Sequence, residues 1–398
     1  MLSQEMLQLG QVRSVIREMF EYGNKRAVEI GRENVFDFSL GNPSIPAPEI
    51  VDLTIKNLLE TENSVILHGY TSAAGDPKVR KRIADFLNGQ YDCSFSKENI
   101  YMTTGAAAAL TISLKAIVNC GDEVIVLAPF FPEYIVFIKN AGGVPIIVKC
   151  REDDFQIDID ALEKAITNKT KAIIINSPCN PTGVVFSKEI IENVCLLLSK
   201  KQQEFNKEIF IIADEPYREL VYDNIEVPFI PNYYDNTILC YSFSKSLSLP
   251  GERIGYILVS NKCKKSSLVF DAVAGAGRSL GYVCASSLFQ RVVVECLGKT
   301  ADLTAYKENR DLLYDALTEY GYEVIKPDGA FYLFVKALEK DANKFCENAK
   351  REELLLVPSD SFGYEGYIRI SYCVSNAMIK RSLPAFKKLA EGYKNGEF

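Results

Sequence analysis

Short β-branched stretches alternate with helical segments through the middle of the chain, and this alternation constrains the fold more than any other feature. It is typical of a mainly parallel sheet covered by helices on both faces, so we expect an α/β fold. The expected strands are 99–104, 123–127, 144–148, 171–176, 209–213, 237–241 and 256–260, and helices are expected at 105–119, 131–140, 157–165 and 188–201.

The chain is too long for a single hydrophobic core. Its 398 residues exceed the usual limit of about 250 to 300, so we expect one large and one smaller domain. A long helical stretch is expected at 285–320, followed by strands at 322–325, 331–335, 354–357 and 367–371 and a helix at 376–389. We therefore divide the chain into an N-terminal arm with part of the small domain (1–48), a large domain (49–290) and a small α+β domain (291–398).

The first 35 residues are expected to form an amphipathic helical arm. Apolar side chains recur there at helical spacing, at Val12, Val15, Ile16, Met19 and Phe20. We expect this stripe to be a packing face.

Charge and cysteine content exclude several classes of protein. The net charge of −7 argues against a nucleic-acid partner, and no apolar run approaches the roughly 18 residues that span a bilayer. No two of the 11 cysteines lie within ten residues of each other, and His68 is the single histidine, so we expect no metal centre. We expect a cytoplasmic protein with reduced thiols.

A lysine surrounded by hydroxyl side chains follows one of the expected strands. The run from Ser242 to Tyr256 reads Ser-Phe-Ser-Lys-Ser-Leu-Ser-Leu-Pro-Gly-Glu-Arg-Ile-Gly-Tyr, with Lys245 near its start. An amine at such a strand end loses solvation, which lowers its pKa and lets it form a Schiff base with a carbonyl. Ser244 and Arg253 add a hydroxyl and a cationic fork of the kind that a phosphate-bearing aldehyde cofactor needs. For the lysine alone, a surface position in a polar loop is the alternative.

Three further expected strands are followed by loops rich in polar and aromatic residues. The loops read Pro129-Phe130-Phe131-Pro132-Glu133-Tyr134, Ser177-Pro178-Cys179-Asn180-Pro181-Thr182-Gly183 and Asp214-Glu215-Pro216-Tyr217. Ligands of parallel sheets bind outside the carboxyl ends of the strands, so we expect these side chains to face the lysine. Any one of them could be a turn residue or a helix cap. Together the loops supply an aromatic ring, an amide, a carboxylate and a phenol at strand ends, and four such groups are hard to assign to turn chemistry.

The junction Gly105-Ala106-Ala107 is a candidate anion site. It lies where an expected strand gives way to an alanine-rich helix, so free N–H groups and the positive end of the helix face the edge of the sheet. The same alanines would also suit tight helix packing.

Together these motifs resemble the class I and II pyridoxal-phosphate-dependent aminotransferases of the aspartate aminotransferase superfamily. The resemblance runs from Gly41-Asn42-Pro43 to Arg369, and the run from Ser242 to Gly255 matches the family's lysine signature at every constrained position. It implies fold type I, in which a mainly parallel, seven-stranded sheet with helices on both faces is joined to a smaller α+β domain. It also implies pyridoxal 5'-phosphate as the cofactor and a homodimer with shared active sites.

The resemblance assigns roles on the cofactor side of the site. Lys245 would form the Schiff base and move a proton between the substrate's α-carbon and the cofactor. Asp214 would pair with the pyridine nitrogen, Phe131 would stack on the ring, and Tyr217 and Asn180 would hydrogen-bond its phenolic oxygen. The phosphate would be held by Gly105, Ala106, Ala107, Ser242, Ser244 and Arg253, with Tyr70 reaching it from a neighbouring subunit.

On the substrate side, Arg369 in Tyr-Ile-Arg-Ile-Ser looks like the bidentate clamp for the α-carboxylate, assisted by the Gly41 backbone and Asn180. Arg278 lies roughly where one subgroup places an arginine that crosses the dimer interface to bind a side-chain carboxylate. A solvent-exposed helix arginine is the alternative. Ala107 stands where one bacterial aspartate-specific subgroup carries a lysine, so that subgroup's recognition mode is absent.

We therefore expect transfer of an amino group from an amino acid to the 2-oxo acid 2-oxoglutarate, with aspartate-like donors favoured if Arg278 faces the site. A C–S β-lyase acting on cystathionine or cysteine shares every group named and is the alternative. A non-enzymatic regulator would need a DNA-binding module ahead of Gly41, and the 40 residues there are too few for a winged helix and a linker.

Overall fold

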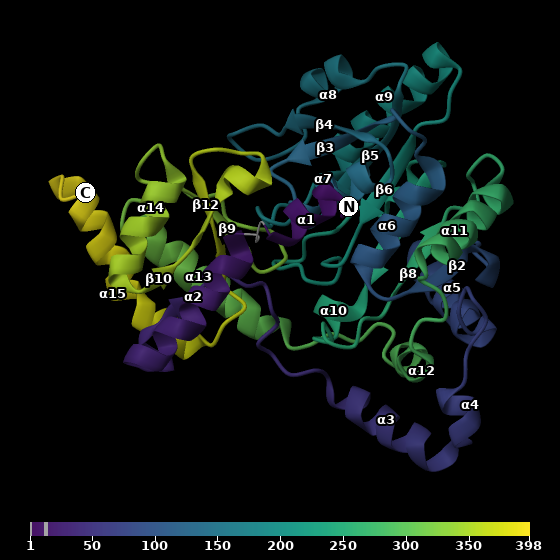
Figure 1. The fold of residues 1–398 in the computed structure, drawn as a ribbon, viewed down its shortest axis with the longest axis horizontal. Helices are drawn as coiled ribbons and strands as arrows, with labels where there is room; N and C mark the ends of the chain where they lie inside the picture. Colours follow the sequence, from purple (N-terminus) through teal and green to yellow (C-terminus); the bar gives the residue numbers. More distant parts are fainter. Residues whose placement is uncertain (1, 12–14) are drawn as a thin grey trace.

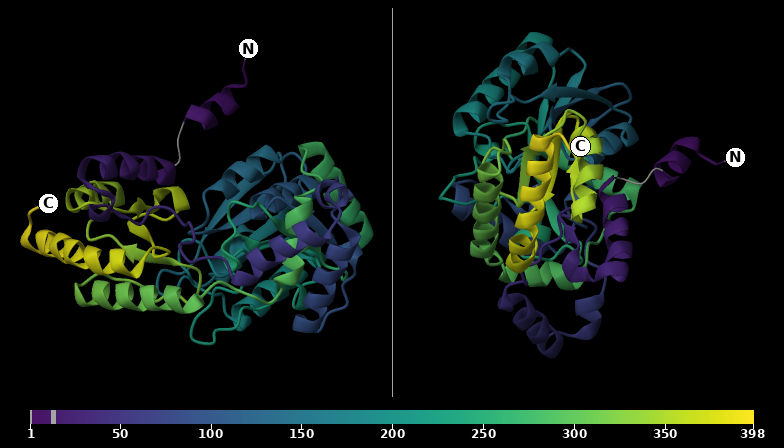
Figure 2. Two further views of the ribbon diagram at one scale, coloured as in Figure 1. Left: turned by 90° about the horizontal axis from the view of Figure 1, so that it is seen from below. Right: turned by 90° about the vertical axis from the view of Figure 1, so that its left-hand side faces the viewer.

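The computed structural model describes residues 2–11 and 15–398, and Figure 1 shows two regions side by side. A seven-stranded sheet with its helices forms the larger region, and a region of small sheets and long helices, which includes the C-terminus, lies beside it. Figure 2 shows the same two regions from two further directions. The predicted fold class, an α/β sheet with a smaller α+β part, is confirmed.

The large sheet has the order β2-β8-β7-β6-β5-β3-β4. Neighbours pair in parallel except at β8, which runs antiparallel to both β2 and β7. Its strands are β2 (Ile100–Thr103), β3 (Glu123–Ala128), β4 (Val144–Lys149), β5 (Thr170–Asn176), β6 (Phe210–Asp214), β7 (Thr237–Ser242) and β8 (Gly255–Val259).

Both faces of this sheet are buried under helices. Along β5, Ile173 and Ile175 pack into one hydrophobic cluster, whereas Ala172 and Ile174 pack into the cluster on the opposite face. The first face is covered by α5 (Pro77–Tyr91), α8 (Ile159–Ala165), α9 (Lys188–Phe205) and α12 (Ser287–Glu295), and the second by α6 (Ala106–Ile117), α7 (Glu133–Asn140) and α11 (Ser266–Leu280). The near-continuous apolar strands follow from burial on both sides.

The second region has its own hydrophobic cluster. Its three-stranded antiparallel sheet has the order β11-β12-β9, and β1 pairs in parallel with β10. The strands are β1 (Phe36–Asp37), β9 (Tyr332–Lys336), β10 (Leu354–Leu355), β11 (Val357–Pro358) and β12 (Tyr367–Ser371), and the helices are α2 (Val15–Ile30), α13 (Leu303–Glu319), α14 (Ala342–Ala349) and α15 (Asn376–Asn395). The predicted boundary at residue 290 falls inside α12, whose Val292 and Val293 pack with the large sheet.

Two local predictions differ from the structure. The expected helix at 285–320 is two helices, because the chain turns at Gly298, which has a φ of +75°, and Asp302 then caps α13. Residues 322–325 form only a single bridge, Val324 to Val335, so the expected strand is wrong.

The N-terminal arm is also divided. Helix α1 (Gln4–Gln11) buries no side chain and stands away from the body in both views of Figure 2, whereas Met19 of α2 packs on Leu355. Val12 of the predicted stripe lies outside the described residues.

Two helices project from the large region. α3 (Glu49–Thr61) and α4 (Ser64–His68) extend beyond α12 at the lower edge of Figure 1. Among the described residues, no helix is long and apolar enough to cross a membrane.

Candidate active site

A cavity of about 290 Å³ opens at the carboxyl edge of the large sheet, where the two regions meet. Asn176, Asp214 and Ser242 end the neighbouring parallel strands β5, β6 and β7 and line it. The predicted site residues that line this cavity are Gly41, Ala106, Ala107, Phe131, Asn180, Asp214, Tyr217, Ser242, Ser244, Lys245, Arg253 and Arg369.

Lys245 lies in the short helix α10 (Phe243–Ser246), directly after β7. Its Nζ donates a hydrogen bond of 2.8 Å to the Gly41 carbonyl and lies 5.4 Å from the centre of the Phe331 ring. Burial, reinforced by Arg253 and Arg369, lowers the pKa of Lys245 to about 8. A much larger fraction of this amine is therefore neutral and nucleophilic near neutral pH than of an ordinary lysine, although the protonated form still predominates at pH 7.

The start of α6 and the loop after β7 form a cradle for an anion. Gly105 precedes α6 with a φ of +88°, and a Cβ there would lie 2.9 Å from Nη2 of Arg253. No side chain caps the helix, so the N–H groups of its first turn face the cavity beside Ala106. The hydroxyls of Ser242 and Ser244 lie 2.8 Å apart on the other side. Hydroxyls, a guanidinium and a helix N-terminus are together suited to a phosphate.

Asp214 ends β6 and is 4% exposed. Its Oδ2 accepts a 2.5 Å hydrogen bond from the Tyr134 hydroxyl, but its Oδ1 is buried without a partner. Burial raises the pKa of the Asp214 carboxyl to about 7, although the Tyr134 hydrogen bond lowers it. An unpaired buried carboxylate oxygen fits a cationic ring N–H, so these residues fit pyridoxal phosphate.

Two phenols and an amide, from Tyr217, Tyr332 and Asn180, also line the cavity. The Tyr217 hydroxyl lies 2.9 Å from the Tyr332 hydroxyl, and both rings are buried. The Asn180 backbone N–H donates a 2.8 Å hydrogen bond to Asn176 Oδ1, which fixes the turn after β5.

Arg369 comes from β12 of the second region and is 2% exposed. Its guanidinium donates to the Ser39 carbonyl at 2.6 Å and to Asn180 Oδ1 at 3.2 Å. Its Nε has no hydrogen-bond partner, and among the described residues no carboxylate pairs with it. A buried arginine held by neutral acceptors is available to a substrate carboxylate.

Three predicted residues, Tyr70, Arg278 and Gly105, do not line the cavity of this chain. Tyr70 is 98% exposed, and Arg278 is exposed in the last turn of α11. Both were expected to act across a dimer interface, so their roles stay predictions. Gly105 contacts Arg253 but is not itself in the lining.

The sequence reasoning missed two functional side chains. Tyr134 lies in the quoted aromatic motif, but nothing in the motif shows that its hydroxyl reaches Asp214, 80 residues away. Tyr332 has no local signal at all, because it meets Tyr217 and Arg369 through the tertiary fold alone. Among the described residues, no group of three or more acidic, Cys or His side chains is placed to hold a metal ion.

Comparisons with known proteins place the chain in a family. Residues 33–386 match the model of the family described as aminotransferase class I and II. The chain is 32% identical to an aspartate aminotransferase of Thermotoga maritima, over 88% of this chain and 90% of the relative. It is 30% identical to a probable aspartate aminotransferase of Methanocaldococcus jannaschii, with 95% and 97% covered.

Solved structures give the same result. An amino transferase from Eubacterium rectale, at 57% identity, superposes with a TM-score of 0.97 over 98% of this chain and 99% of that one. The Thermotoga maritima aspartate aminotransferase structure, at 29% identity, gives a TM-score of 0.86, with 97% and 99% covered. The chain therefore belongs to the class I and II aminotransferases, enzymes that use pyridoxal phosphate.

Proposed function

We propose that the chain binds pyridoxal 5'-phosphate in this cavity and moves an amino group from an amino acid, with aspartate-like donors favoured, to 2-oxoglutarate. One observation carries the proposal: a buried amine of lowered pKa, an unpaired carboxylate oxygen and an arginine without an acidic partner line one cavity. The names of relatives at about 30% identity support the aspartate-like donor.

The cradle and Asp214 would hold the cofactor from both ends. Ser242, Ser244, Arg253 and the N-terminus of α6 would bind its phosphate, and Asp214 Oδ1 would accept its ring N–H. When bound, the cofactor supplies an aldehyde for the amine and a ring that withdraws electrons from the substrate's α-carbon. Phe131, which lines the same cavity, would cover one face of the ring.

Lys245 would be the general base. With cofactor and substrate bound in the cavity that Lys245 lines, its Nζ would take the proton from the substrate's α-carbon, and its pKa of about 8 suits proton transfer near neutral pH. The hydrogen bond to the Gly41 carbonyl orients the lone pair.

Arg369 would orient the substrate. Its forked donors can hold both oxygens of the α-carboxylate, while Asn180 and the Ser39 carbonyl keep the guanidinium in one position. Holding the substrate at its α-carboxylate places the α-carbon within reach of Lys245.

We also propose a homodimer, in which Tyr70 of one subunit reaches the phosphate of the other. Large apolar side chains are exposed on the projecting helices α3 and α4, among them Leu53, Leu59, Val65 and Ile66. Exposed apolar side chains gathered on two projecting helices are typical of a protein interface. Light scattering should give twice the chain mass, and a monomer would contradict the proposal.

The test of the function is a single turnover without added oxo acid. The purified yellow protein is mixed with aspartate, alanine, aromatic amino acids, cysteine or cystathionine, and absorbance and products are followed. Transamination predicts bleaching of the cofactor band and one oxo acid per site, with later recovery on adding 2-oxoglutarate. Pyruvate and ammonia released over many turnovers from cysteine or cystathionine, with the band retained, would instead establish a C–S β-lyase.

A further inference from the structure

We propose that Arg310 is a positioning residue for the substrate side of the site: its guanidinium fixes the segment 327–332 and, through it, the Tyr332 side chain that contacts Tyr217 and Arg369. The inference depends on the proposed function only where it is tested by the KM of an amino donor. Arg310 lies on α13, outside the cavity, and is 1% exposed.

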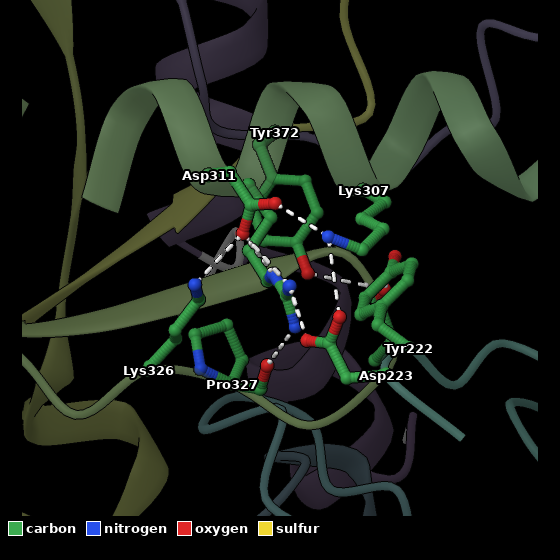
Figure 3. A network of polar contacts seen from close by, with 9 residues as sticks. Tyr222, Asp223, Lys307, Asp311, Lys326, Pro327 and Tyr372 are labelled. Carbon is green, nitrogen blue, oxygen red and sulfur yellow. Dashed lines mark hydrogen bonds and ion pairs between the residues drawn. The ribbon is translucent and has the colours of Figure 1, made fainter. Parts of the chain in front are cut away.

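The Arg310 guanidinium is held by Asp223, Asp311 and the Pro327 carbonyl, and these three partners are labelled in Figure 3. Its Nη2 lies 2.6 Å from Asp223, its Nη1 donates to the Pro327 carbonyl at 3.0 Å, and its Nε donates to Asp311 at 2.9 Å. The plane also lies 4.7 Å from the centre of the Tyr222 ring. A planar fork with this many partners has one orientation, which a lysine cannot reproduce.

Two lysines complete the network. Lys307 lies 3.2 Å from Asp223 and 2.8 Å from Asp311, and Lys326 lies 3.0 Å from Asp311. The network thus joins α13 to the loop after β6 that carries Tyr217, and this loop belongs to the large sheet. Breaking one partner of a buried charge is costly, because the other charge is left uncompensated.

The segment that Arg310 holds lies between the loop that carries Asn180 and the loop that carries Tyr217, and it is hydrogen-bonded to both. The Gly329 N–H donates to the Gly183 carbonyl and the Ala330 N–H to the Leu220 carbonyl, each at 2.8 Å. A Cβ on Gly183 would lie 2.4 Å from the Pro327 side chain, so the packing is tight. Gly183 ends the loop of Asn180, and Leu220 follows Tyr217.

The same segment ends at the substrate side. The Tyr332 hydroxyl lies 2.9 Å from that of Tyr217, and the Arg369 guanidinium lies 4.7 Å from the centre of the Tyr332 ring. A Cβ on Gly41 would lie 2.1 Å from the Tyr332 hydroxyl. A shift of this segment therefore reaches the arginine clamp and the Gly41 backbone, but not the phosphate cradle.

The test compares Asp223→Asn and Arg310→Lys with Lys326→Gln in the holoenzyme. The first two variants weaken the bonds of Arg310, whereas Lys326→Gln removes an ion pair of the same network and leaves every bond of Arg310 in place. Asp223→Asn removes the charge that holds the guanidinium in place, so it tests the proposal even if Arg310→Lys does not fold.

We expect the KM of every amino donor to rise about 5- to 20-fold in the first two variants, less than the loss of a direct contact with the substrate carboxylate would cause, because Arg310 acts through Tyr332. The kcat should change less than threefold and the Kd of pyridoxal phosphate less than twofold, and Lys326→Gln should match the wild type. A folded Asp223→Asn protein with unchanged KM and only a lowered Tm would overturn the proposal, because that is the signature of a merely structural residue.

Hydrogen exchange gives a readout that needs no turnover. The amides of Gly329 and Ala330 should exchange at least about tenfold faster in Asp223→Asn than in the wild type or Lys326→Gln, because the segment opens more often. Equal exchange would overturn the positioning role. If the wild type transaminates no donor, the proposed function fails, and the exchange result still decides whether Arg310 fixes this segment.

Discussion

The two sides of the cavity are built in different ways. The phosphate cradle and Asp214 come from the ends of three strands of one sheet, with Gly105 after β2, Asp214 at the end of β6 and Ser242 at the end of β7. The substrate side, called here the carboxylate side because it would bind the substrate's α-carboxylate, joins four segments that are distant in the sequence: Gly41, Asn180, Tyr332 and Arg369. The cradle therefore depends on the register of the sheet, whereas the carboxylate side depends on how the two regions pack.

This difference predicts which remote changes matter. A substitution in the network around Arg310 should move a segment of the carboxylate side, whereas among the described residues the network makes no hydrogen bond or ion pair with Gly105, Asp214 or Ser242. Binding of the cofactor and binding of the amino donor should therefore respond to different sets of substitutions. The predictions that follow test this separation, from the largest expected effect to the smallest.

Lys245→Ala should lower turnover about 10³-fold or more, because it removes both the Schiff-base amine and the general base. Borohydride should no longer attach the cofactor to the chain, although the cradle should still bind it. Lys264→Ala, which changes a lysine outside the cavity, is the control. Trapped cofactor with wild-type turnover in Lys245→Ala would exclude this lysine.

Arg369→Ala should raise the KM of every amino donor by about 10- to 100-fold, the usual range for lost hydrogen bonds to a charged group. Steady-state kinetics at saturating cofactor measure it, with Arg381→Ala as a control for the loss of one positive charge outside the cavity. An unchanged KM would remove Arg369 from the substrate side.

Gly105→Ala should raise the Kd of pyridoxal phosphate about tenfold. An alanine at a φ of +88° is strained by about 1 to 3 kcal/mol, and its Cβ would press on Arg253. Fluorescence titration of the cofactor-free protein measures this Kd. Gly89→Ala is the matched control, because a Cβ there meets nothing within 4 Å. Equal constants in the two variants would contradict the cradle.

Asp214→Asn should change how the stability of the cofactor-free protein depends on pH. The folded-state pKa of Asp214, about 7, lies above the unfolded value of about 3.9, so the folded state holds the extra proton between these values. Its contribution to the free energy of unfolding is thus present below about pH 4 and is lost as pH rises toward 7.

Urea unfolding at pH 5 and pH 7 measures the effect. As pH rises through this window, the free energy of unfolding of the wild type should fall by up to about 1.4 kcal/mol per pH unit relative to that of Asp214→Asn. The pKa of Asp311 is shifted in the opposite direction to that of Asp214. Partial burial would raise the pKa of its carboxyl, but hydrogen bonds from Lys307, Lys326 and Arg310 lower it to about 2. Identical pH dependence in the wild type and Asp214→Asn would contradict the raised pKa.

The sequence predicted the cradle side better than the carboxylate side, and the reason is physical. Strand ends can be placed from apolar runs and the turn residues after them, so Gly105, Asp214 and Lys245 could be expected at one edge. The contacts of Tyr332 with Tyr217 and Arg369 join segments whose distance in the chain leaves no periodic signal.

The local errors have a similar origin. The break between α12 and α13 had a signal, since Gly298 and Asp302 are a turn residue and a helix cap, but the surrounding apolar spacing masked it. The expected strand at 322–325 has the right composition, yet it finds a partner only at Val324. Composition reports the propensity of a segment, whereas pairing depends on what the fold brings beside it.

The claim that cofactor binding and amino-donor binding are independent is tested most directly by measuring both in variants of each side of the cavity. Pyridoxal phosphate Kd and amino-donor KM are determined for the wild type, Gly105→Ala, Arg369→Ala and the double variant. The account predicts that Gly105→Ala changes only the Kd, that Arg369→Ala changes only the KM, and that the double variant shows both changes without further coupling. If either single variant shifts both constants by comparable factors, the two sides of the cavity are not independent, and the account is contradicted.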